Sequence, residues 1–259
     1  MGVVRSMAMY GSPVWAESLS RRCVAILRKP QRALAQRLIR GYRTIFYEAA
    51  CVLAGSLPWG LDAKFLSRFY HQREEASSPG NRLAPREVEA MKASLRTAAS
   101  EEWQTRLEDP SAGARTVEAV RPVFDQWMDR RHGAATFRLT QVLSGHGCFG
   151  HFLCRVVLKE ESTVCHHCDN CLDDTAQHTL QECPAWEVQR SALRAIVFGD
   201  LSLPAVVSSM VGSPRSWRAM LSFCEQVMSQ KESAERDRER VDPARQRRQR
   251  RRRRVNRTN

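Results

Sequence analysis

Four residues between positions 165 and 183 have the types and the spacing of a metal-binding set. Cys165 and Cys168 are separated by two residues, and His178 and Cys183 follow in the pattern C-x2-C-x9-H-x4-C. Two thiols in that spacing reach one ion from a single tight turn, and three sulfurs with one imidazole nitrogen form a tetrahedral shell that zinc prefers. Because four protein ligands leave no open position for water, the spacing predicts one structural Zn²⁺ ion.

Three neighbouring residues compete for a position in that ligand set: His166, His167 and Cys171. Cys171 creates a C-x2-C-x2-C run of the kind that binds iron–sulfur clusters. The next thiol, Cys183, is too distant for the C-x3-C-P spacing of those clusters, so zinc is favoured. The spacing alone leaves open whether one of the three replaces a predicted ligand.

Two further segments carry reactive side chains but have structural explanations. His146 and Cys148 lie in a glycine-rich stretch, and they suit either auxiliary metal ligation or a Cys/His pair. With no third group to orient such a pair, we favour a turn between helices that packs against the zinc segment. Asp173 and Asp174 resemble the paired aspartates of polymerases, but their position before His178 favours a helix cap. We therefore predict no catalytic residue and no small-molecule substrate.

The net charge of +13 is concentrated at the C-terminal end of the chain. Residues 231–259 carry thirteen Lys and Arg against five Asp and Glu, and Arg250, Arg251, Arg252, Arg253 and Arg254 are consecutive. Like charges at this density oppose folding, so we predict a disordered basic arm. Its expected partners are nucleic-acid phosphates or an acidic nuclear import receptor. The chain has no apolar run long enough for a membrane span.

Helical periodicity dominates the rest of the chain, and strand signals are nearly absent, so we predict a mostly α fold. The expected organisation is a helical N-terminal piece, a linker with a bridging helix, a helical domain that contains the zinc knuckle at 165–183, and the arm; these occupy residues 1–76, 77–113, 114–230 and 231–259. A basic stretch around residues 21–43 is either a solvated helix face or a surface for nucleic acid.

Three segments together resemble one family, the C-terminal part of the polymerase protein of non-LTR (LINE-type) retrotransposons, particularly the jockey-like arthropod group. They are the Y-G-S-P-V-W run at 10–15, the QR, YRT and LAG-x-x-P elements between 31 and 58, and the L-T-Q-V-L-S-G-H-G run at 139–147 with the cysteine cluster behind it. The third segment is the specific one.

This resemblance implies zinc ligation by Cys165, Cys168, His178 and Cys183, and binding of RNA or target DNA in the nucleus. The family is an RNA-directed DNA polymerase, but the catalytic palm is missing here, so the chain alone is expected to be inactive. Alternatives are a zinc-stabilised protein-interaction module and an accessory fragment that supports a separate polymerase core. The residues near the knuckle that we expect to contact nucleic acid are Arg155, Lys159, His166, His167 and Trp186.

Overall fold

Helices make up all the regular structure in the described part of the chain, which comprises residues 2–77, 83–110, 112–197 and 199–242 of this computed structural model. Over those residues there is no strand, and the prediction of a mostly α fold is confirmed. None of the described helices has the length and apolar character needed to cross a membrane. The chain forms two compact units. Unit 1 comprises residues up to 38 and 46–117, and unit 2 comprises residues 39–45 and those from 118 onward.

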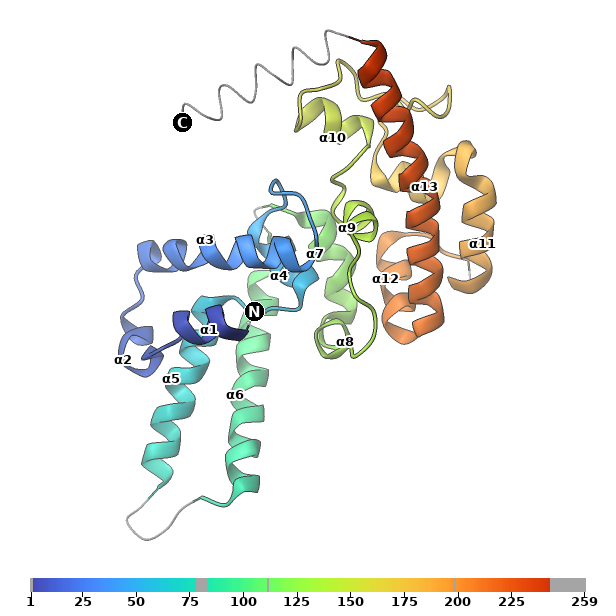
Figure 1. Ribbon diagram of the computed structural model, residues 1–259. Coiled ribbons are helices and arrows are strands. Elements are labelled where there is room, and N and C mark those ends of the chain that lie inside the picture. Colours follow the sequence, from blue (N-terminus) through green and yellow to red (C-terminus); the bar gives the residue numbers. More distant parts are fainter. Residues whose placement is uncertain (1, 78–82, 111, 198, 243–259) are drawn as a thin grey trace. The chain divides into compact units, whose positions relative to one another are not determined.

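Unit 1 contains α1 to α6 and a short 3₁₀ turn (Figure 1). Their bounds are α1 Gly2–Ala8, α2 Ser12–Trp15, η1 Ala16–Ser18, α3 Arg21–Leu38, α4 Tyr47–Ala54, α5 Trp59–Ala76 and α6 Pro85–Arg106. Helices α3 and α4 pack together, and α5 and α6 form an antiparallel pair. Helix α3 continues through Pro30. Pro30 is exposed, and the Ile26 carbonyl that loses its helical N–H partner lies on the same exposed side of the helix.

A buried glutamine joins α3 to the turn between α4 and α5. The Gln31 amide nitrogen donates to the Leu57 carbonyl at 2.8 Å, and its amide oxygen accepts from Tyr47 Oη at 2.6 Å and from the Trp59 backbone N–H at 2.7 Å. Gly55 ends α4 in the left-handed region at φ 60°, a conformation that glycine adopts without a Cβ penalty. The QR and LAG-x-x-P elements of the sequence thus have a structural explanation.

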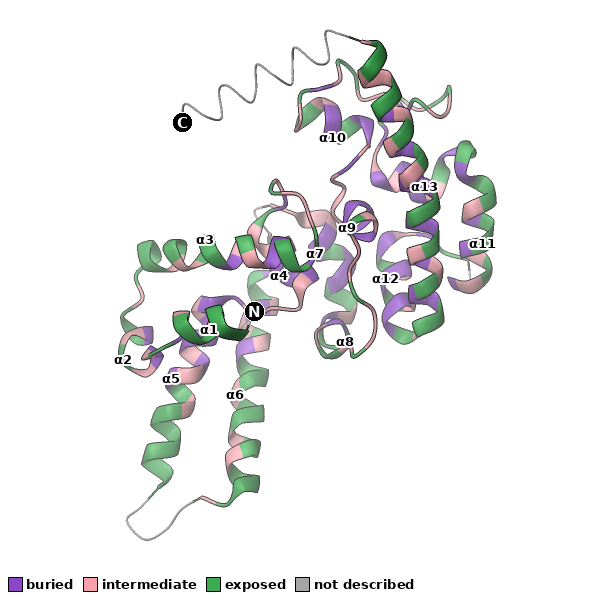
Figure 2. Ribbon diagram, in the orientation of Figure 1, coloured by how far each residue is buried: buried purple, intermediate pink, exposed green. Residues whose placement is uncertain are grey.

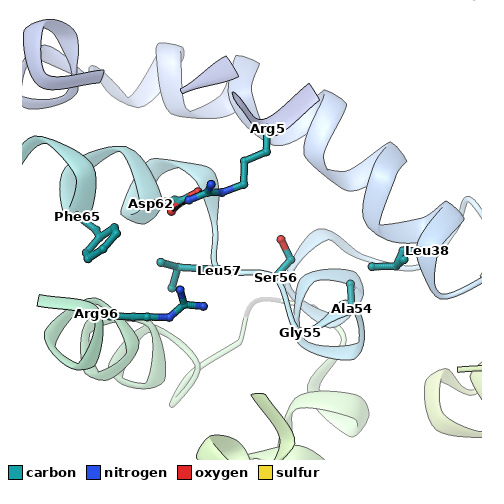
Figure 3. Close-up of a pocket in the computed structure, with 9 residues that line it drawn as sticks. All are labelled: Arg5, Leu38, Ala54, Gly55, Ser56, Leu57, Asp62, Phe65 and Arg96. Atoms are coloured by element: carbon teal, nitrogen blue, oxygen red, sulfur yellow. Dashed lines mark hydrogen bonds and ion pairs between the residues drawn. The ribbon is translucent and has the colours of Figure 1, made fainter. Parts of the chain in front are cut away.

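Unit 1 also has a cavity of about 350 Å³, shown in Figure 3. Arg5 lies at its edge and binds the Asp62 carboxylate with two hydrogen bonds of 2.6 and 2.7 Å, and Arg96 approaches from α6. The Asp62 carboxylate neutralises the charge of Arg5. Leu38, Leu57 and Phe65 make much of the remaining wall apolar.

Unit 2 is built around the long helix α13 (Pro214–Val241), against which α9 (Phe137–Ser144), α11 (Glu187–Val197) and α12 (Leu203–Gly212) pack. The remaining elements are α8 Phe124–Asp129, α10 Gly150–Arg155, the turns η2 Arg121–Val123 and η4 Pro184–Trp186, and the π-helical turn η3 His178–Glu182. Helix α7 (Ala114–Val120) contains the division between the units. Buried side chains follow α13 at helical spacing, and they include Met220, Cys224, Val227, Lys231 and Glu235 (Figure 2).

Three of the expected boundaries differ from the structure. Helix α6 does not bridge two regions, because Ala99 and Trp103 are buried within unit 1. Residues 39–45 fold with unit 2, where Thr140 Oγ1 donates to the Ile39 carbonyl at 2.6 Å. Residues 231–241, expected to be disordered, form the last turns of α13 because Lys231 and Glu235 are buried among partners. The segment 243–259, including Arg250 to Arg254, lies outside the described residues.

Candidate metal centre

The four predicted ligands converge in unit 2. The side-chain donor atoms of Cys165, Cys168, His178 and Cys183 all lie within 4.8 Å of one another. Cys165 and Cys168 come from the irregular segment after α10, His178 begins η3, and Cys183 follows directly after η3. This Cys₃His cluster can hold a metal ion, and three of its four members are buried.

The distances within the cluster fit a tetrahedral ion. Cys165 Sγ lies 3.9 Å from Cys183 Sγ, and Cys168 Sγ lies 3.4 Å from His178 Nε2. Zinc bonds of about 2.3 Å to sulfur and about 2.0–2.1 Å to nitrogen, at tetrahedral angles, place two sulfurs about 3.8 Å apart and a sulfur and a nitrogen about 3.6 Å apart. These two separations are therefore close to those of a tetrahedral zinc site, and the donor set is one that zinc prefers.

Backbone hydrogen bonds hold the two cysteine segments in place. The Cys165 N–H donates to the Cys171 carbonyl at 3.0 Å, which closes a loop that contains Cys168, and the His167 N–H donates to Cys165 Sγ at 3.4 Å. The Cys183 N–H donates to the His178 carbonyl at 2.8 Å, so the last two ligands are joined across η3. His178 Nδ1 lies 3.4 Å from Glu182 Oε2, which orients the ring so that Nε2 faces the cluster.

A buried ion pair joins this loop to α13. Lys231 Nζ lies 2.9 Å from both carboxylate oxygens of Asp174, and the two side chains are 0 % and 3 % exposed. Asp174 also accepts from the Gly150 backbone N–H at 2.9 Å and from Thr179 Oγ1 at 3.4 Å. Asp174 therefore joins α10, the ligand loop and α13 at one point.

Burial makes the thiols of Cys165 and Cys183 weaker acids when no cation is present. It raises the pKa of Cys165 to about 12, and the nearby Asp174 carboxylate adds to the effect. The pKa of Cys183 is raised for the same first reason. A bound divalent cation stabilises the thiolates instead, so metal binding at neutral pH releases protons.

The sequence has clear relatives among insect retrotransposons. It is 30% identical over 231 residues, 86% of the chain, to the "Retrovirus-related Pol polyprotein from type-1 retrotransposable element R1 4" of Nasonia vitripennis. The chain is a homologue of R1 retrotransposon Pol polyproteins. It is also 28% identical over 195 residues to the "Putative 115 kDa protein in type-1 retrotransposable element R1DM" of Drosophila melanogaster.

The R1 homology covers most of this chain but only part of each relative. The match spans 57% of the first Nasonia protein and 18% of the Drosophila protein. A second Nasonia relative, from element R1 3, is 27% identical over 59% of the chain and is matched over 43% of its own length. Neither a protein-family model nor a solved structure matches the chain. The three R1 relatives confirm the resemblance to non-LTR retrotransposon proteins.

The three competing ligands of this R1 homologue have other surroundings. The His167 ring lies against Trp186, with ring centroids 4.9 Å apart, and His166 Nε2 lies 3.6 Å from Glu160 Oε1. Burial lowers the pKa of His167 to about 4. Among the described residues, the group that converges within metal-binding distance does not include His166, His167 or Cys171.

Two of the residues expected to contact nucleic acid are not at the surface. Lys159 is buried and ion-paired with Glu235 and with Glu239, the latter at 2.8 Å, and Trp186 is only 3 % exposed. Lys159 and Trp186 are therefore not available for contacts with nucleic acid, because both side chains are buried inside unit 2. Arg155 and His166 are exposed, and His167 is half-buried.

Lys231 and Arg190 were not anticipated from the sequence, although both support the ligand loop. Arg190 is buried and donates to the Cys183 carbonyl. A signal for Lys231 exists in the periodicity of α13, where it falls on the buried stripe three and four residues after Met228 and Val227. A charged residue at a core position requires a buried partner, but the local sequence does not say which one.

The glycine-rich segment before α10 forms a turn between helices, as expected. Gly145 ends α9 in the left-handed region at φ 71°, and the His146 ring meets the edge of Phe152 with centroids 4.7 Å apart. Burial lowers the pKa of His146 to about 4 and raises the pKa of Cys148 to about 12. Both side chains therefore stay uncharged at neutral pH, which suits packing better than catalysis.

The three polar residues of the predicted helix cap, Asp173, Asp174 and Thr175, each have a different partner. Thr175 Oγ1 accepts from the His178 N–H at 3.1 Å and acts as the cap. Asp174 faces Lys231, and Asp173 lies 2.8 Å from His151 Nδ1 at the surface. The two aspartates therefore point to different partners, unlike a pair that shares one metal ion.

Proposed function

We propose that the chain is the nucleic-acid-binding part of a retrotransposon reverse transcriptase, with unit 2 organised around one structural Zn²⁺ ion. The observation that carries the proposal is the closed Cys₃His cluster in a homologue of R1 Pol polyproteins. A site with four protein ligands holds a loop in shape and leaves no position for a reacting group. The partner we propose is RNA or DNA of the element or its target.

The cluster would act by fixing the exposed residues around it. Arg155 ends α10, and Gly150 at the start of that helix is tied to the ligand loop through Asp174. His166 lies between two ligands and is exposed. A guanidinium at the end of α10 and an imidazole on the adjoining loop, both held in place, can contact phosphate and base edges at little entropic cost.

The location we propose for this activity is the nucleus, with the Arg-rich segment 243–259 as a second phosphate-binding or import-receptor-binding element. That segment lies outside the described residues, so the proposal rests on its nine arginines alone. Fusing the chain to a fluorescent protein, with and without residues 243–259, tests the location. Equal nuclear signal from both fusions would show that residues 243–259 are not needed for nuclear localisation.

Binding of labelled single-stranded RNA, single-stranded DNA and duplex DNA to the zinc-loaded chain tests the function. We compare the parent chain, Cys165→Ser as the metal-site variant, Cys171→Ser as the matched thiol control, and the double variant Arg155→Gln/His166→Gln. The parent and Cys171→Ser should bind with a Kd below about 100 µM at 0.15 M salt, the weak limit of non-specific nucleic-acid binding. Cys165→Ser and the double variant should bind more weakly.

Two results would contradict the proposal. A parent chain that binds none of the three probes in that range would favour a protein-interaction module. A Cys165→Ser chain that loses zinc and still binds all probes like Cys171→Ser would show that the cluster stabilises a fold with another purpose.

A further inference from the structure

The strongest charged surface outside the metal centre belongs to α3 of unit 1. Over its 18 residues this helix carries six cations and no acidic residue, and we name these six the α3 basic face: Arg21, Arg22, Arg28, Lys29, Arg32 and Arg37. At 100° per residue the six fall within about half of the helix circumference. They are exposed except for Arg32, which is half-buried, and most of α3 is coloured as exposed in Figure 2.

The opposite side of α3 is already occupied. Leu27 and Leu34 pack against the core formed by Met9, Ala16, Trp59 and Ala63, and Gln31 and Ala35 are fully buried. A basic amphipathic helix on a membrane inserts its apolar side between lipids. Ile26 and Leu38 are exposed, but Leu27, Leu34 and Ala35 are turned toward the protein, so the apolar side of α3 is mostly occupied and its basic side remains as the surface for a partner.

Three of the exposed charges on this face, those of Arg22, Lys29 and Arg37, have no acidic partner among the described residues. Arg28 lies 3.5 Å from Glu48 Oε1 and over the Tyr47 ring. Arg28 and Arg32 are like charges four residues apart, an arrangement that disfavours the helix. An ordinary solvated face mixes charges of both signs, so a one-signed face indicates an anionic partner.

We propose that the α3 basic face binds the phosphate backbone of a nucleic-acid duplex. The choice of nucleic acid as the anionic partner rests on the proposed function. The choice of a duplex rests on α3 itself. From Arg21 to Arg37 the helix rises about 24 Å, a length of B-DNA that carries about 14 phosphate charges. Proteins that bind single strands use aromatic side chains on which bases stack, and α3 has no aromatic residue.

The test is the salt dependence of binding to duplex DNA by the full zinc-loaded chain. The variant Arg22→Gln/Lys29→Gln/Arg37→Gln removes three charges from the face. The matched control, Arg68→Gln/Arg73→Gln/Arg86→Gln, removes three exposed charges from α5 and α6 of the same unit. On B-DNA the first variant should lower the slope of log K against log salt by about 2.7, because each phosphate contact contributes about 0.9. The control should keep the parent slope.

Further variants separate this inference from the proposed function. The variant Arg22→Lys/Arg37→Lys keeps the charges and should keep the slope, and circular dichroism should show equal helix content in all variants. If Cys165→Ser weakens binding and the α3 variant behaves like its control, the proposed function stands and the α3 inference is wrong. If only the α3 variant changes the slope, the inference stands and the metal centre has another role.

Two other outcomes would also overturn the inference. The α3 variant and its control could lower the slope equally, in which case the contribution is net charge and not this face. Alternatively, the α3 variant could lose binding to vesicles of anionic phospholipid and keep its affinity for the duplex. The face would then be a membrane-binding surface.

Discussion

Breaking the buried pair between Lys231 and Asp174 should destabilise unit 2 more than any surface change. The variants are Lys231→Met and Asp174→Asn, singly and together. Both replacements keep the approximate size of the side chain. Asparagine also keeps an oxygen for the Gly150 N–H, which donates to Asp174 at 2.9 Å. The experiment therefore changes the charge and leaves most of the packing in place.

The expected magnitude follows from the burial of the two groups, 0 % and 3 % exposed. Removing one member of a buried pair leaves the other charge without compensation and costs about 3–5 kcal/mol. Removing both leaves neither charge of this pair without its partner, so the double variant should cost at least about 2 kcal/mol less than the sum of the single variants. The exposed pair of Arg240 and Asp237, 78 % and 64 % exposed, serves as control, and Arg240→Met should cost at most about 1 kcal/mol.

Urea unfolding of the zinc-loaded chain, followed by tryptophan fluorescence, measures these free energies, and a chelator competition measures the zinc affinity of each variant. Because Asp174 lies between the ligands Cys168 and His178, each single variant should also bind zinc more weakly than the parent. Single variants that cost less than about 1 kcal/mol, like Arg240→Met, would refute the conclusion that this pair holds the ligand loop to α13.

Three further predictions concern the same unit. Cys165→Ser should retain no stoichiometric zinc after gel filtration while Cys171→Ser retains about one equivalent by metal analysis, and equal retention would exclude Cys165 as a ligand. Burial lowers the pKa of His146 from 6.5 to about 4, so the unfolded chain takes up the proton first and stability falls as the pH decreases from about 6.5 towards 4. His146→Leu should remove about 1–2 kcal/mol of that loss between pH 7 and pH 5, and an unchanged pH profile would contradict it. A Cβ on Gly150 would lie 2.5 Å from a backbone carbonyl oxygen, so Gly150→Ala should lower the free energy of unfolding in urea by about 1–3 kcal/mol. The control Gly212→Ala, where a Cβ meets nothing within 4 Å, should not lower it by that amount.

The convergence of Cys165, Cys168, His178 and Cys183 could be predicted because their spacing is a local pattern. All four ligands lie within nineteen residues, and the spacing between Cys165 and Cys168 already limits the turn that joins them. The mostly α fold was predictable for a similar reason, since helical periodicity is visible within single segments. Both predictions depend on neighbours in sequence.

The support of the site could not be predicted, because its partners are distant in sequence. Asp174 and Lys231 are 57 residues apart, and Lys159 and Glu235 are 76 residues apart. The local sequence around Lys159 suggests a surface lysine, but its partner Glu235 lies on α13. Trp186 is covered in part by the His167 ring, which the local sequence does not indicate. In each case tertiary packing decides the environment of a side chain whose local sequence is neutral.

We propose that Cys165, Cys168, His178 and Cys183 hold one zinc ion in a closed site. X-ray absorption at the zinc edge of the purified, zinc-loaded chain tests it most directly. We predict one zinc per chain with three sulfur neighbours at about 2.3 Å and one nitrogen at about 2.0–2.1 Å, and no bound water. A shell of four sulfurs would replace His178 by Cys171, and a shell with a water ligand would contradict a closed structural site.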